Sequence, residues 1–191
     1  MSDYRRMHAP GARFFLTLVT EHRRPLFADA VNVDRLRSVT ARVRDSLHFE
    51  LLAAVILPDH LHWLIELPHG EADFSKRIGK IKAGFTKALP ATERPAASIT
   101  PSRRRKREQM VWQRRFWEHT IRDERDLEAH VDYVHYNPVK HGHCACPHQW
   151  RYSSFGRWVR AGRYSTDWVC VCNGRRPSTP DFGHLGATAA E

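Results

Sequence analysis

Residues 50–67 read ELLAAVILPDHLHWLIEL and contain the pattern that decides the fold. Two apolar runs, Glu50 to Leu57 and His60 to Leu67, are separated by Pro58-Asp59. Apolar runs of this length are typical of strands, and a Pro-Asp pair between them is typical of a turn. The stretch therefore predicts two antiparallel strands joined by a tight connection.

The second of these runs places two histidines on one face of its strand. Side chains alternate between the two faces of a strand, so His60 and His62 share one face and Leu61, Trp63 and Ile65 share the other. Cα atoms two residues apart on a strand are about 6.5 to 7 Å apart, a span that two imidazoles can close on one metal ion. Two histidines at this spacing also occur as ordinary surface or core residues, and both interpretations stay open here.

The segments on either side of residues 50–67 show alternating strand and helix patterns. The predicted strands outside the quoted stretch are residues 13–20 (RFFLTLVT) and a last one, with its approach, in residues 110–121 (MVWQRRFWEHTI). The predicted helices are residues 33–47, residues 74–89 (basic and amphipathic) and residues 123–136, with Asp123 as N-cap and Asn137-Pro138 as the end. This order predicts an α+β fold, a ferredoxin-like antiparallel sheet with helices on one face, followed by a C-terminal extension.

The domain organisation follows from length and local composition. The 191 residues fit one domain, which we place at residues 1–172. Within it, residues 90–109 are rich in Pro, Ala and Ser, end in a run of Arg and Lys, and are expected to form a mobile basic insertion. Residues 173–191 have the composition of a disordered tail.

The charge of the chain points to a polyanionic partner. Thirty-one Lys and Arg residues against 21 Asp and Glu residues give a formal net charge of +10. Such an excess causes self-repulsion unless a polyanion neutralises it, and nucleic acid is the leading candidate. No apolar run reaches the roughly 20 residues of a membrane span, and the N-terminus lacks the apolar region of a signal peptide. We therefore expect a cytoplasmic protein that makes no contact with a membrane.

Four cysteines form two Cys-x-Cys pairs late in the chain. The pairs are Cys144 with Cys146 and Cys170 with Cys172. Their single-residue spacing is tighter than that of ordinary zinc sites, so four free thiols are the simpler interpretation. A structural zinc ion, with His148 completing a Cys-x-Cys-x-His set, is the alternative.

The last predicted helix carries a tyrosine and an amide on one face. Leu127, Val131 and Val134 define its apolar stripe, and Tyr133 lies about 100° from that stripe. Asn137 follows Tyr133 by four residues and therefore lies on the same face one turn on. Taken alone, the pattern favours ordinary structural roles, with Tyr133 as a half-buried aromatic residue and Asn137 as a helix C-cap.

Several of these stretches together resemble a known family. Residues 57–62 (LPDHLH) are similar to the histidine-hydrophobic-histidine signature of the HUH single-strand nucleases. Residues 112–119 (WQRRFWEH) and 130–142 (HVDYVHYNPVKHG) resemble the REP-associated tyrosine transposases, as do Tyr4-Arg5-Arg6 and residues 150–155 (WRYSSF). The likeness covers roughly residues 3 to 170 in the right order. The long basic insertion at residues 90–109 departs from it.

The resemblance implies a function and a set of site residues. It implies a metal-dependent nuclease and strand transferase that acts on single-stranded or hairpin DNA, such as repetitive extragenic palindromes, through a covalent 5′-phosphotyrosine. Tyr133, first in the Tyr-x-x-Tyr-Asn-Pro run, would be the nucleophile and Tyr136 the competing one. His60, His62 and Asn137 would bind a divalent cation, Mg²⁺ or Mn²⁺. Expected DNA contacts are Tyr4, Arg5, Arg6, Arg114, Arg115, Lys80 and Lys82.

Two other functions fit the same residues less specifically. A non-catalytic module that binds nucleic-acid hairpins would need the charge and the sheet but neither the histidines nor the tyrosine. An interaction protein stabilised by zinc would depend on the cysteine pairs. The sequence leaves open whether the chain acts as a monomer or a homodimer.

Overall fold

The computed structural model describes residues 12–94 and 111–172 and six positions beyond them. These positions are Gly174, Pro177, Ser178, Pro180, Phe182 and Leu185. The expected DNA contacts Tyr4, Arg5 and Arg6 lie outside the described residues, and so does most of the expected insertion. At the start of this predicted insertion, residues Ala91–Glu93 form a 3-10 turn, and Asn32 donates a hydrogen bond to the Glu93 carboxylate over 2.7 Å.

Four antiparallel strands form one sheet in the order β2-β3-β1-β4. The strands are β1 (Arg13–Val19), β2 (Glu50–Ile56), β3 (His60–Glu66) and β4 (Trp117–Thr120). The predicted hairpin is present, and the backbone N–H of Leu57 donates to the carbonyl of His60 across its turn. β1 lies between β3 and β4 and is paired along both edges. This strand order and the helical crossovers confirm the α+β, ferredoxin-like class.

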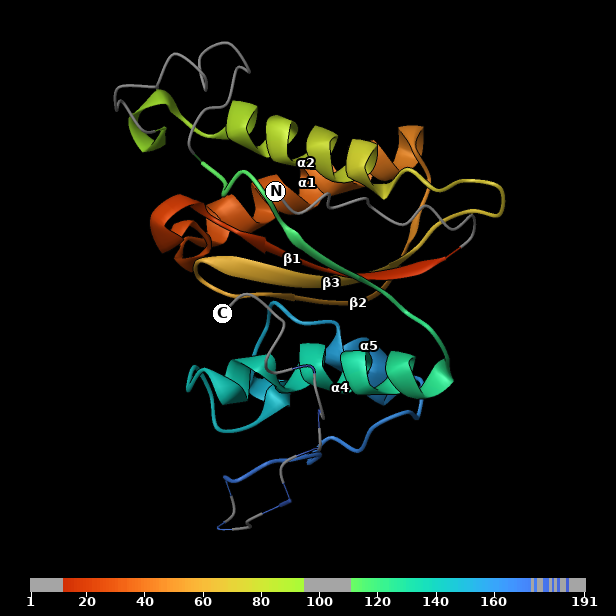
Figure 1. The fold of residues 1–191 in the computed structure, drawn as a ribbon. Helices are drawn as coiled ribbons and strands as arrows, with labels where there is room; N and C mark the ends of the chain where they lie inside the picture. The colour runs from red at the N-terminus through yellow and green to blue at the C-terminus, as the bar shows by residue number, and fades with distance from the viewer. Residues whose placement is uncertain are drawn as a thin grey trace, which may run out of the picture.

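Two helices cover the face of the sheet that carries Leu61, Trp63 and Ile65. They are α1 (Ala30–Ser46) and α2 (Phe74–Ala88), which pack on each other above the sheet in Figure 1. Each begins at an aspartate whose side chain accepts a backbone N–H of the first turn, Asp29 for α1 and Asp73 for α2. Their apolar stripes and this strand face form the larger core of the protein.

The prediction that all helices share one face is wrong for the last part of the chain. α4 (Glu124–Lys140) and α5 (Phe155–Arg160) lie on the opposite side of the sheet from α1 and α2 (Figure 1). The reason is that the second sheet face is also apolar: Phe15 and Leu64 point to it and pack with Val131 and Val134 of α4. A strand buried on both sides needs cover on both sides. No helix in the described ranges is both long and apolar enough to cross a bilayer.

α4 also continues past its predicted end. The sequence predicts a stop at Asn137-Pro138, but the helix runs to Lys140 with Pro138 inside its last turn. Proline removes one backbone donor, yet the His141 N–H still bonds to the Asn137 carbonyl, and Gly142 then adopts a φ of +70°, as glycine commonly does after a helix. The extra turn makes Asn137 a helical residue one turn after Tyr133 and not a helix C-cap.

The C-terminal part closes the second layer. Residues 152–154 hydrogen-bond to the free edge of β2, where Ile56 N–H donates to Tyr152 and Ser154 N–H donates to Ala54. The tail predicted to be disordered contains two packed residues among those described: Leu185 is buried and Phe182 packs in the same cluster as Tyr133.

Candidate active site

The two histidines of β3 lie under α4, between the sheet and the helix. Their ring centroids are 5.0 Å apart, and His60 is 2% exposed and His62 0% exposed. Neither is therefore an ordinary surface residue. They also do not line an open surface cleft, because α4 and the packed C-terminal residues cover this face of the sheet.

Asp59, the last turn residue before β3, orients the imidazole of His60. Nδ1 of His60 donates a hydrogen bond to the Asp59 carboxylate over 2.5 Å, and Arg23 pairs with the other oxygen at 3.0 Å. Burial alone would raise the pKa of Asp59, but the hydrogen bonds from His60 and Arg23 hold it below its ordinary value. With the proton fixed on Nδ1, Nε2 of His60 carries the lone pair. Carboxylates support metal-binding histidines in this way in many proteins.

His62 is held neutral by its surroundings. Burial lowers the pKa of His62 well below the ordinary value, and the nearby His60, His141 and Lys140 lower it further. Its Nδ1 is 2.9 Å from the hydroxyl of Thr17 on β1. When Nδ1 donates to that hydroxyl, Nε2 is left as a lone pair. A neutral imidazole with a buried lone pair is the form that binds a metal ion.

Tyr133 of α4 packs directly against this pair. Its ring centroid is 5.3 Å from that of His62, and Phe15 of β1 contacts both rings. Tyr133 is only 1% exposed, whereas its position on the helix predicted a place at the edge of a cleft. C-terminal residues contribute to this burial: the ring centroid of Phe182 is 5.5 Å from that of Tyr133, and Leu185 belongs to the same cluster.

Tyr136, the competing tyrosine, lies three residues after Tyr133 on α4. It is half-buried and packs on Phe182, with 5.5 Å between ring centroids. Of the two tyrosines, Tyr133 is the one whose ring contacts a histidine of β3.

Asn137 brings a buried amide to the same place. It is 0% exposed and close enough to His62 to influence its pKa. Within the described part of the chain, neither atom of its amide group makes a well-formed hydrogen bond, and the same holds for Nε2 of His62. Buried polar atoms left in this way are uncommon and suit a site that binds an ion. The donor set of two imidazoles and an amide oxygen fits a divalent cation with room for further oxygen ligands.

Two residues that the sequence did not single out also belong to this cluster. His141 directly follows α4, and its ring centroid is 5.2 Å from that of His60. Nζ of Lys140 lies 5.0 Å from the ring centroid of Tyr133. Helix register from Asn137 would have located both residues, but only after the helix was known to continue through Pro138.

A second group of polar residues ties β4 to α4. Asp126 accepts a hydrogen bond from His119 over 2.8 Å and one from the backbone of Arg122 over 2.9 Å, and Nδ1 of His130 is 3.1 Å from its other oxygen. Burial would raise the pKa of Asp126, but the hydrogen bonds from His119 and Arg122 lower it to about 2. The network fixes the start of the helix that carries Tyr133.

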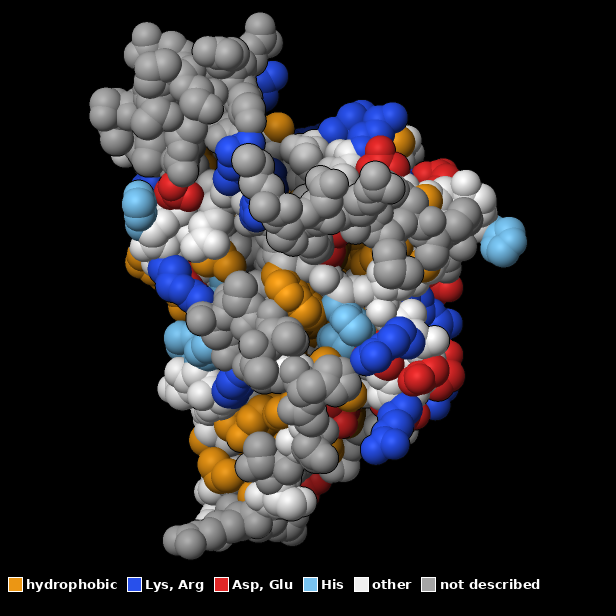
Figure 2. All heavy atoms as spheres, viewed as in Figure 1, with side chains coloured by type: hydrophobic (Ala, Val, Ile, Leu, Met, Phe, Trp, Pro, Cys, Tyr) orange, Lys and Arg blue, Asp and Glu red, His pale blue; other side chains and the backbone are white. Residues whose placement is uncertain are grey.

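Lys80 and Lys82, two of the expected basic contacts in the described part of the chain, lie on the other side of the sheet from Tyr133. Lys80 and Lys82 belong to α2, and Arg114 and Arg115 are exposed in the segment before β4. Nζ of Lys82 donates to the carbonyl of Gln113 over 2.7 Å, so this segment lies against α2. Figure 2 shows Lys and Arg side chains around α2 and again beside the start of α4.

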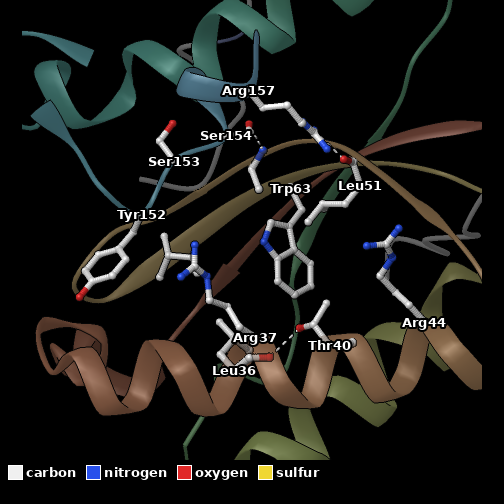
Figure 3. A pocket seen from close by; sticks show the side chains of 13 residues that line it. Leu36, Arg37, Thr40, Arg44, Leu51, Trp63, Tyr152, Ser153, Ser154 and Arg157 are labelled. Carbon is white, nitrogen blue, oxygen red and sulfur yellow. Dashed lines mark hydrogen bonds between the residues drawn. The ribbon is translucent and has the colours of Figure 1, made fainter. Parts of the chain in front are cut away.

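A pocket of about 310 Å³ opens between α1 and β2. Trp63 forms its floor, and Arg37, Arg44 and Arg157 stand around it (Figure 3). Trp63 and the two histidines point to opposite faces of β3, so this pocket is separate from the Tyr133 cluster.

Comparison with known proteins identifies the family. Residues 11–137 match the family model described as Transposase IS200 like. A REP-associated tyrosine transposase of Escherichia coli is 37% identical over 169 residues, 88% of this chain and 92% of that protein. A Haemophilus influenzae protein with the same family description is 41% identical and covers 88% of this chain and 93% of its own length. A solved structure of a REP-associated tyrosine transposase bound to a REP hairpin superposes with a TM-score of 0.74 at 35% identity, covering 95% of this chain and 98% of that one.

The fold and the matched residues are those of an IS200-like transposase. Within that class, the chain belongs to the REP-associated tyrosine transposases.

Proposed function

We propose that this transposase cleaves and rejoins single-stranded DNA beside hairpins, with Tyr133 as the nucleophile and a divalent cation held by His60, His62 and Asn137. The observation that carries the proposal is the packing of the Tyr133 ring against His62, with His60 and the Asn137 amide beside it. In the structure these groups come from β3 and α4 of the same chain.

The chemistry is a transesterification that needs no nucleotide hydrolysis. The phenol oxygen of Tyr133 forms a bond to phosphorus and loses its proton, the bond from phosphorus to the 3′ oxygen breaks, and that oxygen leaves as a 3′ hydroxyl. The DNA stays joined to the protein through a 5′-phosphotyrosine. Attack by another 3′ hydroxyl reverses the step, which makes the protein a strand transferase.

The tyrosine needs electrostatic help. A phenol with a pKa near 10 is ionised about one part in a thousand at pH 7, a handicap of roughly 4 kcal/mol. Lys140, with Nζ 5.0 Å from the ring centroid, places a positive charge beside the phenol. When bound at the histidine pair, Mg²⁺ or Mn²⁺ would supply Lewis-acid stabilisation of charge on the phosphate oxygens. Two imidazole ligands favour Mn²⁺ of the two.

Hairpin DNA is the substrate that we propose. The relative that superposes on this chain is described as bound to a REP hairpin, and the net charge of +10 suits a nucleic acid. Arg114, Arg115, Lys80 and Lys82 would contact phosphates, together with Tyr4, Arg5 and Arg6 of the N-terminal segment. A chain that acts on DNA in this way works in the cytoplasm, with the nucleoid.

DNA entry requires a rearrangement. Tyr133 is 1% exposed because Phe182 and Leu185 pack with it. A phosphate can reach the phenol only when these C-terminal residues move away. The structure therefore corresponds to a closed form of the proposed site.

The test is formation of a covalent adduct. Full-length protein is incubated with labelled single-stranded hairpins that carry flanking sequence, with Mn²⁺, with Mg²⁺ and with chelator, and is then resolved on denaturing gels. We expect a labelled protein band and a shortened strand with Mn²⁺, and neither with chelator. Hairpin binding without cleavage under every metal condition would favour the non-catalytic module instead.

A further inference from the structure

The two Cys-x-Cys pairs converge in the folded chain. Cys146, at the start of a 3-10 turn (Pro147–Gln149), and Cys170, in the segment after α5, are 0% and 3% exposed and are paired as a disulfide. Sγ of Cys172 lies 2.7 Å from Sγ of Cys170. The expectation of four free thiols is therefore wrong, because the fold gathers sulfur atoms that are 24 residues apart in sequence.

A histidine completes the cluster. His148 offers a ring nitrogen within 4.8 Å of the sulfurs of Cys146 and Cys170. Its Nδ1 donates to the carbonyl of Thr166 over 3.1 Å, so Nε2 keeps the lone pair. A backbone carbonyl holds metal-binding histidines in the same way in known sites. His148 and Cys172 are exposed and Cys146 and Cys170 are buried, so the cluster is open to solvent on one side.

We propose that Cys146, His148, Cys170 and Cys172 bind a zinc ion when reduced. A disulfide uses two of these sulfurs and leaves Cys172 as a thiol beside it, whereas one tetrahedral zinc ion uses three thiolates and an imidazole. With Zn–S bonds of about 2.3 Å and Zn–N bonds of about 2.0 Å, ligand atoms lie roughly 3 to 4 Å apart. The ligand atoms of Cys146, His148 and Cys170 already lie within 4.8 Å of one another. The exposed side chain of Cys172 would turn from its place beside Cys170 to take the fourth position. Cysteines in a reducing compartment with this arrangement are more often metal ligands than disulfides.

The tight Cys-x-Cys spacing, which argued against zinc in the sequence, applies to only one pair of the proposed ligand set. Cys144 lies outside the set and His148 takes its place, whereas Cys170 and Cys172 keep the single-residue spacing. Val169, just before Cys170, has a φ of +47°, a left-handed conformation that a β-branched residue rarely adopts. This backbone conformation directly precedes Cys170 and therefore affects the direction of its side chain.

The proposed ion would join two segments near the active site. The cluster links residues 144–149, which follow α4, to residues 165–172, and the backbone N–H of Val171 already bonds to Ala145. The first segment continues from His141, whose ring contacts His60, to Trp150, whose indole donates to the Ile56 carbonyl over 2.9 Å. Zinc would therefore stabilise the segment that packs against His60 and would take no part in the reaction.

The first test is metal content and cobalt spectroscopy of the reduced full-length protein. We expect about one zinc ion per chain and, after exchange for Co²⁺, thiolate-to-cobalt charge-transfer bands that imidazole or amide ligands do not produce. A His60→Ala, His62→Ala double variant should keep both signals, which separates this site from the catalytic one. Reduced protein that contains no zinc and shows no such bands would overturn the proposal and leave the disulfide as the native form.

Variants assign the ligands. Cys170→Ser should reduce bound zinc at least tenfold, and Cys144→Ser, an equivalent change two residues from Cys146, should keep the wild-type content. Because replacement of a buried cysteine can prevent folding, the exposed Cys172→Ser and His148→Ala are tested as well. Each should raise the zinc dissociation constant at least tenfold in chelator competition with an unchanged circular dichroism spectrum, and Cys172→Ser should lose about a third of the charge-transfer intensity. Wild-type affinity in both exposed variants would refute the ligand set.

Discussion

The ring of Tyr133 on α4 meets the imidazole of His62 on β3 with 5.3 Å between centroids and an interplanar angle of 72°. The two residues are 71 positions apart in sequence and belong to different layers of the fold. Their contact exists because α4 covers the sheet face that α1 and α2 leave open. This contact supports the choice of Tyr133 as the proposed nucleophile and motivates the predictions below.

Removal of one hydroxyl should separate binding from chemistry. Tyr133→Phe keeps the ring that packs on His62 and Phe15 but lacks the nucleophilic oxygen. We expect no covalent DNA adduct, at least a 1000-fold loss of cleavage, and hairpin affinity within about threefold of wild type by gel shift. Tyr136→Phe is the matched control and should keep forming the adduct. Undiminished adduct in Tyr133→Phe would transfer the nucleophilic role to another residue.

The histidine pair should respond to metal. His62→Ala should abolish cleavage, and because the imidazole is fully buried it should also lower stability, by about 1 to 3 kcal/mol. Mn²⁺ at 100 times its Kd should stabilise the wild type by about 2.7 kcal/mol and should not stabilise His62→Ala. Thermal melts with and without Mn²⁺ measure both effects. An equal Mn²⁺ shift in the variant would place the ion elsewhere.

Loss of the C-terminal cover should expose the site. Phe182→Ala removes the ring that packs on Tyr133 and Tyr136 and should increase the initial rate of adduct formation severalfold. The variant should bind hairpins with unchanged affinity if Phe182 only restricts access to Tyr133. Single-turnover kinetics compare it with Phe182→Leu, which retains apolar bulk. The rate of Phe182→Leu should lie between the rates of the wild type and of Phe182→Ala. A slower reaction in Phe182→Ala would instead mean that Phe182 helps to position the tyrosine.

Asp126 should contribute to stability in a defined pH range. Its pKa falls from 3.8 to about 2 on folding, so its contribution is complete above pH 4 and is lost as the pH drops from about 4 to 2. At pH 7, Asp126→Asn should cost about 1 to 2 kcal/mol, the lower value allowing for solvent screening. Urea unfolding of both proteins should converge near pH 2. A difference that persists there would indicate lost packing and not lost charge.

The arginines before β4 should act through phosphates. Arg114→Ala with Arg115→Ala should weaken binding to all hairpins similarly and reduce the slope of log affinity against log salt by about 1 to 2. The control is Arg160→Ala with Arg163→Ala, which also removes two exposed arginines, in and just after α5, and should leave the slope unchanged. Fluorescence anisotropy over a salt series provides both values. A loss confined to one hairpin sequence would point to base contacts instead.

Local patterns were sufficient for most of the elements. The alternation in residues 60–66 correctly placed His60 and His62 on one face, and the spacing of apolar residues located α1 and α2. Both predictions succeeded because a buried face requires apolar residues at the repeat of the helix or strand that carries it. The same patterns could not show that the second sheet face needs a helix of its own. They also predicted an end of α4 that is too early. Proline can occupy the last turn of a helix when other backbone groups of that turn still form hydrogen bonds, as His141 N–H does with the Asn137 carbonyl.

What the sequence alone determined is the set of elements, their order, and which His, Tyr and Asn residues are candidates for the site. What only the tertiary structure decided is which groups meet: Tyr133 and not Tyr136 at His62, Asp59 behind His60, and Phe182 over the tyrosine. The physical reason is that the spacing of apolar residues determines which face of a helix or strand is buried. Which buried faces then meet depends on how the elements pack across the sheet. Residues far apart in sequence leave no local trace of that packing.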